Sequence, residues 1–129
     1  MSRLAGTLSQ GTQPFIYGLS GKTLIYKTAT VTNTTVNVYT VTSGKIFYLV
    51  AAGLTYGIGA GGTSSCALQI DDASNILLEL IGRGGAAGES GLAGLSNQAP
   101  YPIAAGRVFQ VYSQDATLTA IAWIIGWED

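Results

Sequence analysis

Apolar and polar residues alternate with a period of two along most of the chain, and helical periodicity is nearly absent. Threonine, valine, isoleucine and tyrosine are frequent, and 18 glycines help to interrupt the pattern with turns. Because successive side chains of a strand point to opposite faces, this pattern indicates half-buried strands. We predict strands at Thr23–Val31, Thr35–Val41, Lys45–Leu54, Ser64–Ile70, Ile76–Ile81, Leu92–Gln98, Arg107–Ser113 and Thr117–Trp127, with Tyr101–Ala104 extending the sixth.

Eight short strands in 129 residues fit one domain made of two packed sheets. The predicted fold class is therefore all-β, a single-domain eight-stranded jelly-roll β-sandwich with an extended N-terminal arm. A repeat supports it, since "TVTSGKIFYLV" (40–50) and "PIAAGRVFQVY" (102–112) share apolar–x–x–Gly–basic–apolar–Phe. Each glycine can supply the positive φ of a turn. Two similar halves suit a sandwich in which each half gives strands to both sheets.

The first twenty residues differ from the rest, so we divide the chain into an arm (1–20) and a sandwich (21–129). The arm alternates only weakly, contains Pro14, and has one apolar cluster, Phe15-Ile16-Tyr17. A free arm would not need such a cluster, whereas a docked arm would use it as an anchor. We expect Phe15, Ile16 and Tyr17 to contact another subunit. Docking on the arm's own subunit is the alternative.

Charged residues are scarce. They make up 10% of the chain, against about 25% in an average protein. A monomer of 13.3 kDa exposes on the order of 6,500 Å², which leaves roughly one charge per 500 Å². We therefore expect part of the surface to be covered by further copies of the chain or by a larger assembly. No apolar run approaches the roughly 18 residues that a membrane span needs, and a net charge of −1 gives no support to nucleic-acid binding.

One glycine-rich stretch resembles a nucleotide site. In "LTYGIGAGGTSSCALQI" (54–70), Gly57, Gly59 and Gly62 have the GxGxxG spacing of dinucleotide-binding loops. That motif needs a helix to begin at the last glycine, because the helix N-terminus holds the pyrophosphate. The residues after Gly62 alternate with a period of two, which predicts a strand. We therefore interpret the stretch as a structural loop, and we expect no cofactor.

Residues able to perform catalysis are few. The chain has no histidine, which removes the usual general base near neutral pH. Cys66 lies on the inward face of its strand, so we expect it to be buried. Asp71 and Asp72 belong to "DDASN", the pattern of a turn, with weak Ca²⁺ binding as the alternative. We expect Glu128 and Asp129 to be solvated. No catalytic, cofactor-binding or metal site is predicted, and the chain is not expected to be an enzyme.

Four aromatic residues, Tyr101, Tyr112, Trp123 and Trp127, are the candidates for a sugar-binding surface. The two tryptophans lie in "IAWIIGWED", a last strand whose apolar density is typical of a core. Their separation of four residues places them on one face, so we expect them to pack as a pair. We favour the core or a subunit interface over sugar binding.

Four stretches together resemble small phage structural proteins with a single jelly-roll domain. They are "VYTVTSGKIFYLVAAGLTYG", "LQIDDASNILLEL", "YPIAAGRVFQVYS" and "AIAWIIGWED", and they cover about Thr35 to Asp129. The resemblance implies a trimer that serves as a capsid decoration (cement) protein or as the head or collar of a fibre. It also implies a protein without enzymatic activity.

We therefore expect a homotrimer that binds the major capsid protein of a phage shell and stabilises it. The expected location is the capsid surface of the virion, after synthesis in the host cytoplasm without secretion, because the first residues lack the apolar core of a signal peptide. The alternative is a tail-fibre or receptor-binding adhesion module that recognises surface glycan. A cupin-like metal enzyme is excluded because its metal site needs histidines.

Overall fold

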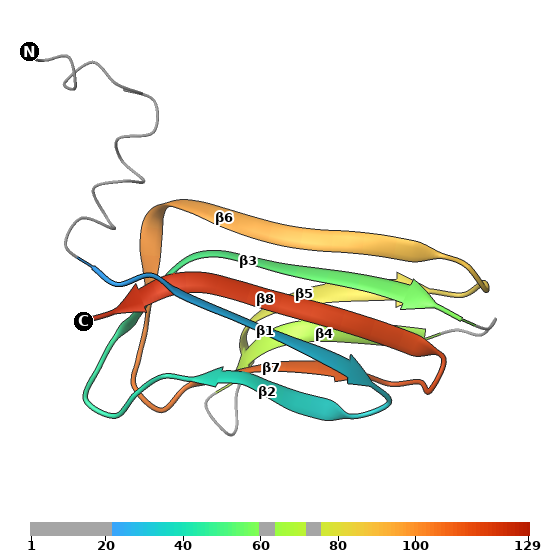
Figure 1. Cartoon of the computed structure of the whole chain (residues 1–129), viewed down its shortest axis with the longest axis horizontal. Helices are drawn as coiled ribbons and strands as arrows, with labels where there is room; N and C mark the ends of the chain where they lie inside the picture. The colour runs from blue at the N-terminus through green and yellow to red at the C-terminus, as the bar shows by residue number, and fades with distance from the viewer. Residues whose placement is uncertain (1–21, 60–63, 72–75) are drawn as a thin grey trace, which may run out of the picture.

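A computed structural model describes residues 22–59, 64–71 and 76–129, and these residues form eight β-strands and no helix (Figure 1). The strands are β1 (Ile25–Thr32), β2 (Thr35–Thr40), β3 (Phe47–Ile58), β4 (Ser64–Asp71), β5 (Ile76–Gly84), β6 (Ser90–Ile103), β7 (Val108–Ser113) and β8 (Leu118–Glu128). β3 continues four residues beyond its predicted end, because Gly57 and Ile58 still pair with β8. β6 includes the predicted extension at Tyr101.

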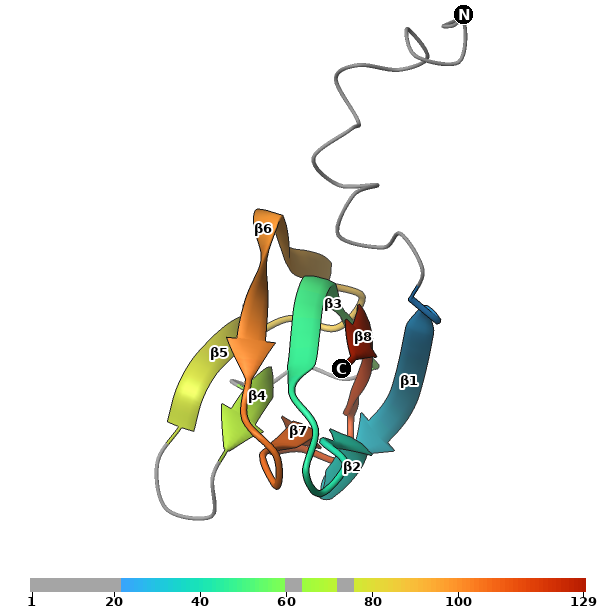
Figure 2. The same ribbon diagram turned by 90° about the vertical axis from the view of Figure 1, so that its left-hand side faces the viewer.

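The eight strands form two antiparallel sheets that pack face to face (Figure 2). Sheet A has the order β1-β8-β3-β6 and sheet B has the order β2-β7-β4-β5. β1 pairs with β8, β2 with β7, β3 with β6 and β4 with β5, so the chain forms one long hairpin that is rolled into two layers. This winding is that of a jelly roll, in which each half of the chain supplies two strands to each sheet. The predicted all-β sandwich is confirmed.

The core lies between the sheets and follows the alternation of the strands. On β8, the inward positions Leu118, Ala120, Ala122 and Ile124 are all fully buried. Across the core, the inward residues of β4 and β7 are buried to the same degree, and Cys66 is among them, as predicted. The burial of inward positions leaves the outward positions to determine what each sheet presents to its surroundings.

The sequence repeat builds one end of the sandwich. Gly44 and Gly106 both have positive φ, 78° and 85°, as the repeat predicted. The two turns lie side by side, because Gly106 N donates a hydrogen bond of 3.1 Å to Val41 O. Three residues after each glycine, Phe47 and Phe109 are fully buried, and their ring centroids lie 5.3 Å apart, edge to face. Matching positions of the two repeats thus meet across the core.

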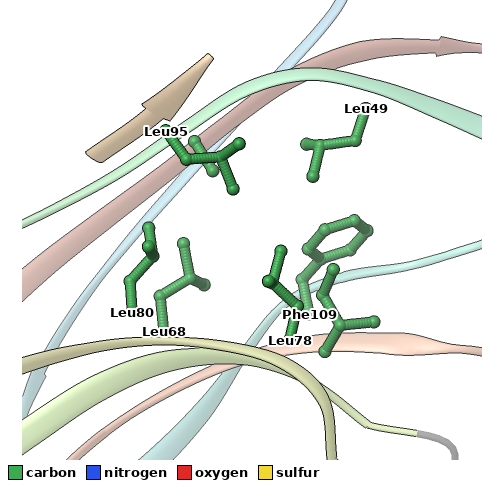
Figure 3. Close-up of a pocket in the computed structure, with 8 residues that line it drawn as sticks. Leu49, Leu68, Leu78, Leu80, Leu95 and Phe109 are labelled. Atoms are coloured by element: carbon green, nitrogen blue, oxygen red, sulfur yellow. The ribbon is translucent and has the colours of Figure 1, made fainter. Parts of the chain in front are cut away.

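The interior contains a small cavity, which is shown in Figure 3. Leu49 and Leu95 reach it from sheet A, and leucines of β4 and β5 reach it together with Phe109 from sheet B. Its volume is about 10 Å³, room for roughly one water molecule, whereas ligand pockets measure about 300–1,000 Å³. This cavity therefore cannot hold a ligand, and the surface is the place to look for a functional site.

The predicted arm, residues 1–20 with Phe15, Ile16 and Tyr17, lies outside the described residues. So do residues 60–63 of the glycine-rich loop and Asp72 of the predicted acidic turn. The division of the chain into an arm and a sandwich therefore stays a prediction.

Candidate functional site

The outer face of sheet A carries no charged side chain among its described residues. The outward position of each strand follows from the pairing register and from the burial of its neighbours. These positions hold Tyr26, Thr28 and Thr30 on β1, Ile121, Trp123, Ile125 and Trp127 on β8, Tyr48, Ala51, Gly53 and Thr55 on β3, and Leu92, Gly94 and Ser96 on β6. The face is therefore aromatic and aliphatic, and its polar side-chain groups are hydroxyls and the indole N–H groups of the two tryptophans.

Several large apolar side chains of this face are exposed. The exposed fractions are 72% for Leu92, 57% for Tyr26 and 42% for Ile121. One of the hydroxyls is already paired, because Thr28 Oγ1 donates a hydrogen bond of 2.9 Å to Ala122 O. Large contiguous apolar patches on a soluble protein mark interaction surfaces. The outer face of sheet A, which we call the docking face, is therefore the candidate interaction surface of the described residues.

A hollow of about 420 Å³ lies on this face between β8 and β6. Its lining includes Ala51, Leu92, Gly94, Ser96 and Trp123. The indole of Trp123 lies directly against Gly53, where any Cβ would collide with the ring. Small residues thus form the floor, while Leu92 and Trp123 form the walls. We call this feature the sheet A hollow.

The two tryptophans of β8 lie on this outer face and not in the core between the sheets. They share one face, as expected, but their packing partners differ from the prediction. Trp127 stacks on Tyr48 with ring centroids 5.3 Å apart and is only 5% exposed, while Trp123 lies over Gly53. The predicted pair was wrong because residues four apart on a strand are separated by about 13 Å, so that each ring packs across the sheet instead.

The outer face of sheet B has a different character. Asn37, Gln110, Gln69 and Glu79 occupy neighbouring positions of its four strands and form a polar row across the sheet. Gln110 Nε2 donates to Asn37 Oδ1 at 3.0 Å within this row. Two isoleucines of the edge strand β5 are also exposed on this face, of which Ile76 pairs with Asp71 and Ile81 with Ala67. The polar row can remain hydrated, so the outer face of sheet B is chemically different from that of sheet A.

The four candidate aromatic residues therefore do not form a single surface. Tyr112 lies on the outer face of sheet B, whereas Trp123 and Trp127 lie on that of sheet A. Tyr101 lies on β6 and is 46% exposed. A sugar platform made from all four residues is excluded by this arrangement.

Glu128 is partly exposed, but its carboxylate also has a structural role that the sequence does not predict. Its Oε2 accepts hydrogen bonds from Tyr39 Oη at 2.6 Å and from Thr42 N at 2.8 Å. Burial raises the pKa of this carboxyl, but the bonds from Thr42 and Tyr39 outweigh that effect, and the net pKa is lowered. Burial, and next the bond to Glu128, raise the pKa of Tyr39. The carboxylate thereby ties β2 of sheet B to β8 of sheet A.

Other carboxylates are also engaged in structure. Glu89 accepts backbone hydrogen bonds from Gly85 and Ala86, which lower its pKa, and Asp115 accepts from the backbone and hydroxyl of Thr117 with the same effect. Both caps hold turns. Lys22 Nζ lies 2.8 Å from Asp129 Oδ2, and the hydrogen bond and charge of this lysine lower the pKa of the Asp129 side chain. These carboxylates stabilise loops and ends, and no pair of them faces across a cleft in the described part of the chain.

Other candidate chemistry does not assemble. Cys66 is fully buried, and burial raises the pKa of its thiol. Gly62 is followed by the strand β4 and not by a helix, so the nucleotide motif lacks its structural context. Within residues 22–59, 64–71 and 76–129, no three histidine, cysteine or acidic side chains come together to hold a metal ion. The same residues contain no helix of sufficient length and apolarity to span a bilayer.

The sequence identifies the docking face only in part, because it predicts a subunit surface at Leu92–Gln98 with Tyr101 and allows an interface for Trp123 and Trp127. Its signal was present, because every second residue of β8, from Thr119 to Trp127, is uncharged. This signal is weak, because uncharged residues on the outer face of a strand look like core residues in the sequence until the pairing of the strand is known. Pairing then brings the outward residues of β1, β3 and β6 beside them.

No family model matches the chain, and no curated protein matches it either. Solved structures do resemble it. A chain in the acid-stable capsid of a Helicobacter pylori bacteriophage is 14% identical, with a TM-score of 0.50, over 82% of this chain and 92% of that one. A pentameric capsid protein from metagenomic phage sequences is 19% identical, with a TM-score of 0.49, over 98% of this chain and 74% of that one. At such low identity, the likeness concerns the fold.

Proposed function

We propose that this chain is a structural protein of a bacteriophage particle, namely a capsid decoration protein that stabilises the shell as a homotrimer. In this role the outer face of sheet A is covered in the assembled particle, and the polar face of sheet B remains in solvent. The arm, residues 1–20, reaches another subunit and uses Phe15, Ile16 and Tyr17 as its anchor. The protein acts on the capsid surface of the virion and performs no catalysis.

The observation that carries this proposal is the contrast between the two outer faces. Sheet A exposes Leu92, Tyr26 and Ile121 with no charge among its described outward positions, while sheet B carries a polar row. A permanent interface explains why such a face is kept apolar. The fold likeness to a bacteriophage capsid chain adds that this architecture suits a phage shell.

Glycan binding by a tail fibre explains the same face less well. Sugar sites combine an aromatic platform with planar polar side chains that bind hydroxyls, and the described outward residues of sheet A offer no amide or carboxylate. Moreover, Trp127 is 5% exposed and stacked on Tyr48, so that its ring face is already used. Glycan binding by an adhesion module is therefore the alternative that the test must distinguish.

The test is attachment to shells assembled from the major capsid protein of the phage that encodes this chain. Light scattering of the free protein should give three times the chain mass of 13.3 kDa, about 40 kDa. The protein should also co-sediment with shells and raise the temperature at which they break. A charge at Ile121, which is 42% exposed on sheet A, should abolish assembly, while the same change at Ile81, 46% exposed on sheet B, should not.

Two results would contradict the proposal. One is a monomer at micromolar concentration that does not bind shells. The other is binding to host surface glycans without shells, which would instead support the adhesion module.

A further inference from the structure

The sheet A hollow has the shape and chemistry of a receptor for a bulky apolar side chain. A Cβ placed on Gly94 would meet only Ala52 O at 3.6 Å, so the space above the glycine is open. Leu92, 72% exposed, and Trp123 border this space, and none of the lining residues is charged. An aromatic or branched side chain that enters the hollow can contact Leu92 and Trp123. It meets no protruding side chain at Gly94.

The chain itself contains a segment of matching chemistry. The 21 residues before Lys22 contain a single charged side chain, Arg3, and their one apolar cluster is Phe15-Ile16-Tyr17. An uncharged aromatic cluster is complementary to an uncharged hollow, because neither side must give up the hydration of a charge on contact. Binding surfaces are commonly anchored by such aromatic residues in pockets.

The position of Lys22 limits which hollow this cluster can reach. Lys22 lies beside the end of β8, because its Nζ is 2.8 Å from Asp129 Oδ2. The hollow lies at the level of Trp123, about 20 Å away along the strand and two to three strand spacings of about 4.8 Å to the side. The straight distance is thus about 23–25 Å. Seven residues separate Phe15 from Lys22, and they span at most about 23–25 Å when fully extended.

Within one copy, the anchor side chains, which extend about 6 Å beyond their Cα atoms, could enter the hollow only if the residues that connect them to Lys22 were nearly fully extended. The Cα atom of Tyr17 falls about 7 Å short, which is about the length of its own side chain. Such stretching costs the connection most of its conformational freedom. A hollow on an adjacent copy carries no such restriction, since the distance is then set by how the copies are arranged. The geometry therefore favours an exchange between copies.

We propose that Phe15, Ile16 and Tyr17 of one copy dock in the sheet A hollow of a neighbouring copy. This inference rests on the proposed function, because it requires several copies side by side. The contact joins two different surfaces, so that successive copies connect head to tail, and such contacts close into a ring when the rotation between copies permits. A trimer in which each copy gives one arm and receives another is a ring of this kind.

Disulfide trapping tests the docking directly on the full chain. Gly18→Cys places a thiol beside the anchor and Ser96→Cys places one at the hollow, while the native Cys66 is fully buried and remains unchanged. A mixture of the two single variants can link only different copies. After the two variants are mixed 1:1 and co-assembled, mild oxidation should link up to about half of the chains into dimers, because only some junctions of a three-membered ring then carry both thiols. The control replaces Ser96→Cys with Asn37→Cys, an exposed position on the outer face of sheet B, and should give little product.

A second set of variants tests whether the linkage depends on the apolar character of the hollow. Gly94→Glu adds a charge to the hollow without a backbone clash, and it should lower the yield of linked dimers at least about tenfold, because a buried carboxylate without a partner is costly. Leu92→Ala should cause a smaller loss in the same direction. Ile81→Glu, on sheet B, should leave the yield unchanged.

The results separate this inference from the proposed function. Three results would overturn arm exchange. They are equal linkage with Asn37→Cys, linkage that does not change with Gly94→Glu, and a chain carrying both Gly18→Cys and Ser96→Cys that links only within one copy. If the unmodified protein still forms trimers and binds shells in that case, the proposed function stands and the arm docks elsewhere. A monomer that does not bind shells would contradict both.

Discussion

The hydrogen bonds to Glu128 connect the two sheets at one end of the sandwich, and they allow a quantitative prediction. Tyr39 Oη and Thr42 N both donate to the same carboxylate oxygen, at 2.6 and 2.8 Å. Hydrogen bonds to charged groups contribute about 1.5–3 kcal/mol when buried, and less here because Glu128 is partly exposed. Glu128→Gln keeps the shape and removes the charge. We expect it to cost about 1 kcal/mol of unfolding free energy, or about 3–5 °C in Tm for a domain of this size.

The dependence of this loss on pH follows from the two pKa shifts. The pKa of Glu128 is lowered in the folded protein, so its contribution is present above the unfolded value of about 4.3 and disappears as the pH falls through the lower folded value. The pKa of Tyr39 is raised, so its contribution is present below about 10 and is lost as the pH rises through the higher folded value. The difference between wild type and Glu128→Gln should be largest between about pH 5 and 10.

The assay is urea unfolding of the wild type, Glu128→Gln, Tyr39→Phe and the double variant at pH 3, 7 and 11. The double variant should be about 1 kcal/mol more stable than the sum of the single losses predicts, because both changes remove one shared interaction. Additive losses, or a Glu128→Gln effect that is as large at pH 3 as at pH 7, would refute the reasoning. In that case the carboxylate would contribute through packing and not through its charge.

Four further changes have definite expected outcomes. Phe47→Ala should cost about 3–5 kcal/mol in denaturant unfolding, because the ring is fully buried; a loss under about 1 kcal/mol would show that the core collapses around the gap. Gly44→Ala should cost about 1 kcal/mol through its φ of 78°, while Gly57→Ala, equally free of contacts but without positive φ, should be nearly neutral by the same measurement. Cys66 should resist a thiol reagent in native buffer and react once in denaturant; rapid native labelling would contradict its burial. Deletion of residues 1–20 should leave a folded sandwich that melts cooperatively but should abolish trimer formation and assembly with shells, as measured by thermal melts and light scattering; a truncated chain that does not fold at all would place the arm in its own core.

The sandwich could be predicted because its information is local and periodic. The repeat is the clearest case, since it predicted the two turns through Gly44 and Gly106, and the structure shows in addition that the phenylalanine of each copy is buried. The strand ends were harder. Gly57 reads as a loop residue, yet it lies within β3 because the neighbouring strand β8 continues and supplies hydrogen-bonding partners.

The candidate site could not be predicted because it depends on pairing between distant strands. Trp123 reads as a core residue in sequence, and only the register places it over Gly53, 70 positions earlier, on the outer face. Glu128 likewise reads as a solvated end, because its partners Tyr39 and Thr42 are distant in sequence. Alternation shows which residues share a face of a strand, but it does not show which face is inside.

The uniform chemistry of the docking face explains why an arm would accompany it. The strands of sheet A have 8, 11, 12 and 14 residues and cover about 700 Å² in flat projection, which is comparable to the roughly 800 Å² that each partner contributes to a stable interface. The area is therefore sufficient, but the described outward residues lack the charged pairs that fix register between partners. An arm that inserts Phe15, Ile16 and Tyr17 into the hollow would supply a defined position. If trapping instead shows the hollow empty in the assembled trimer, the face must be covered by a larger partner surface, and the shell itself becomes the candidate.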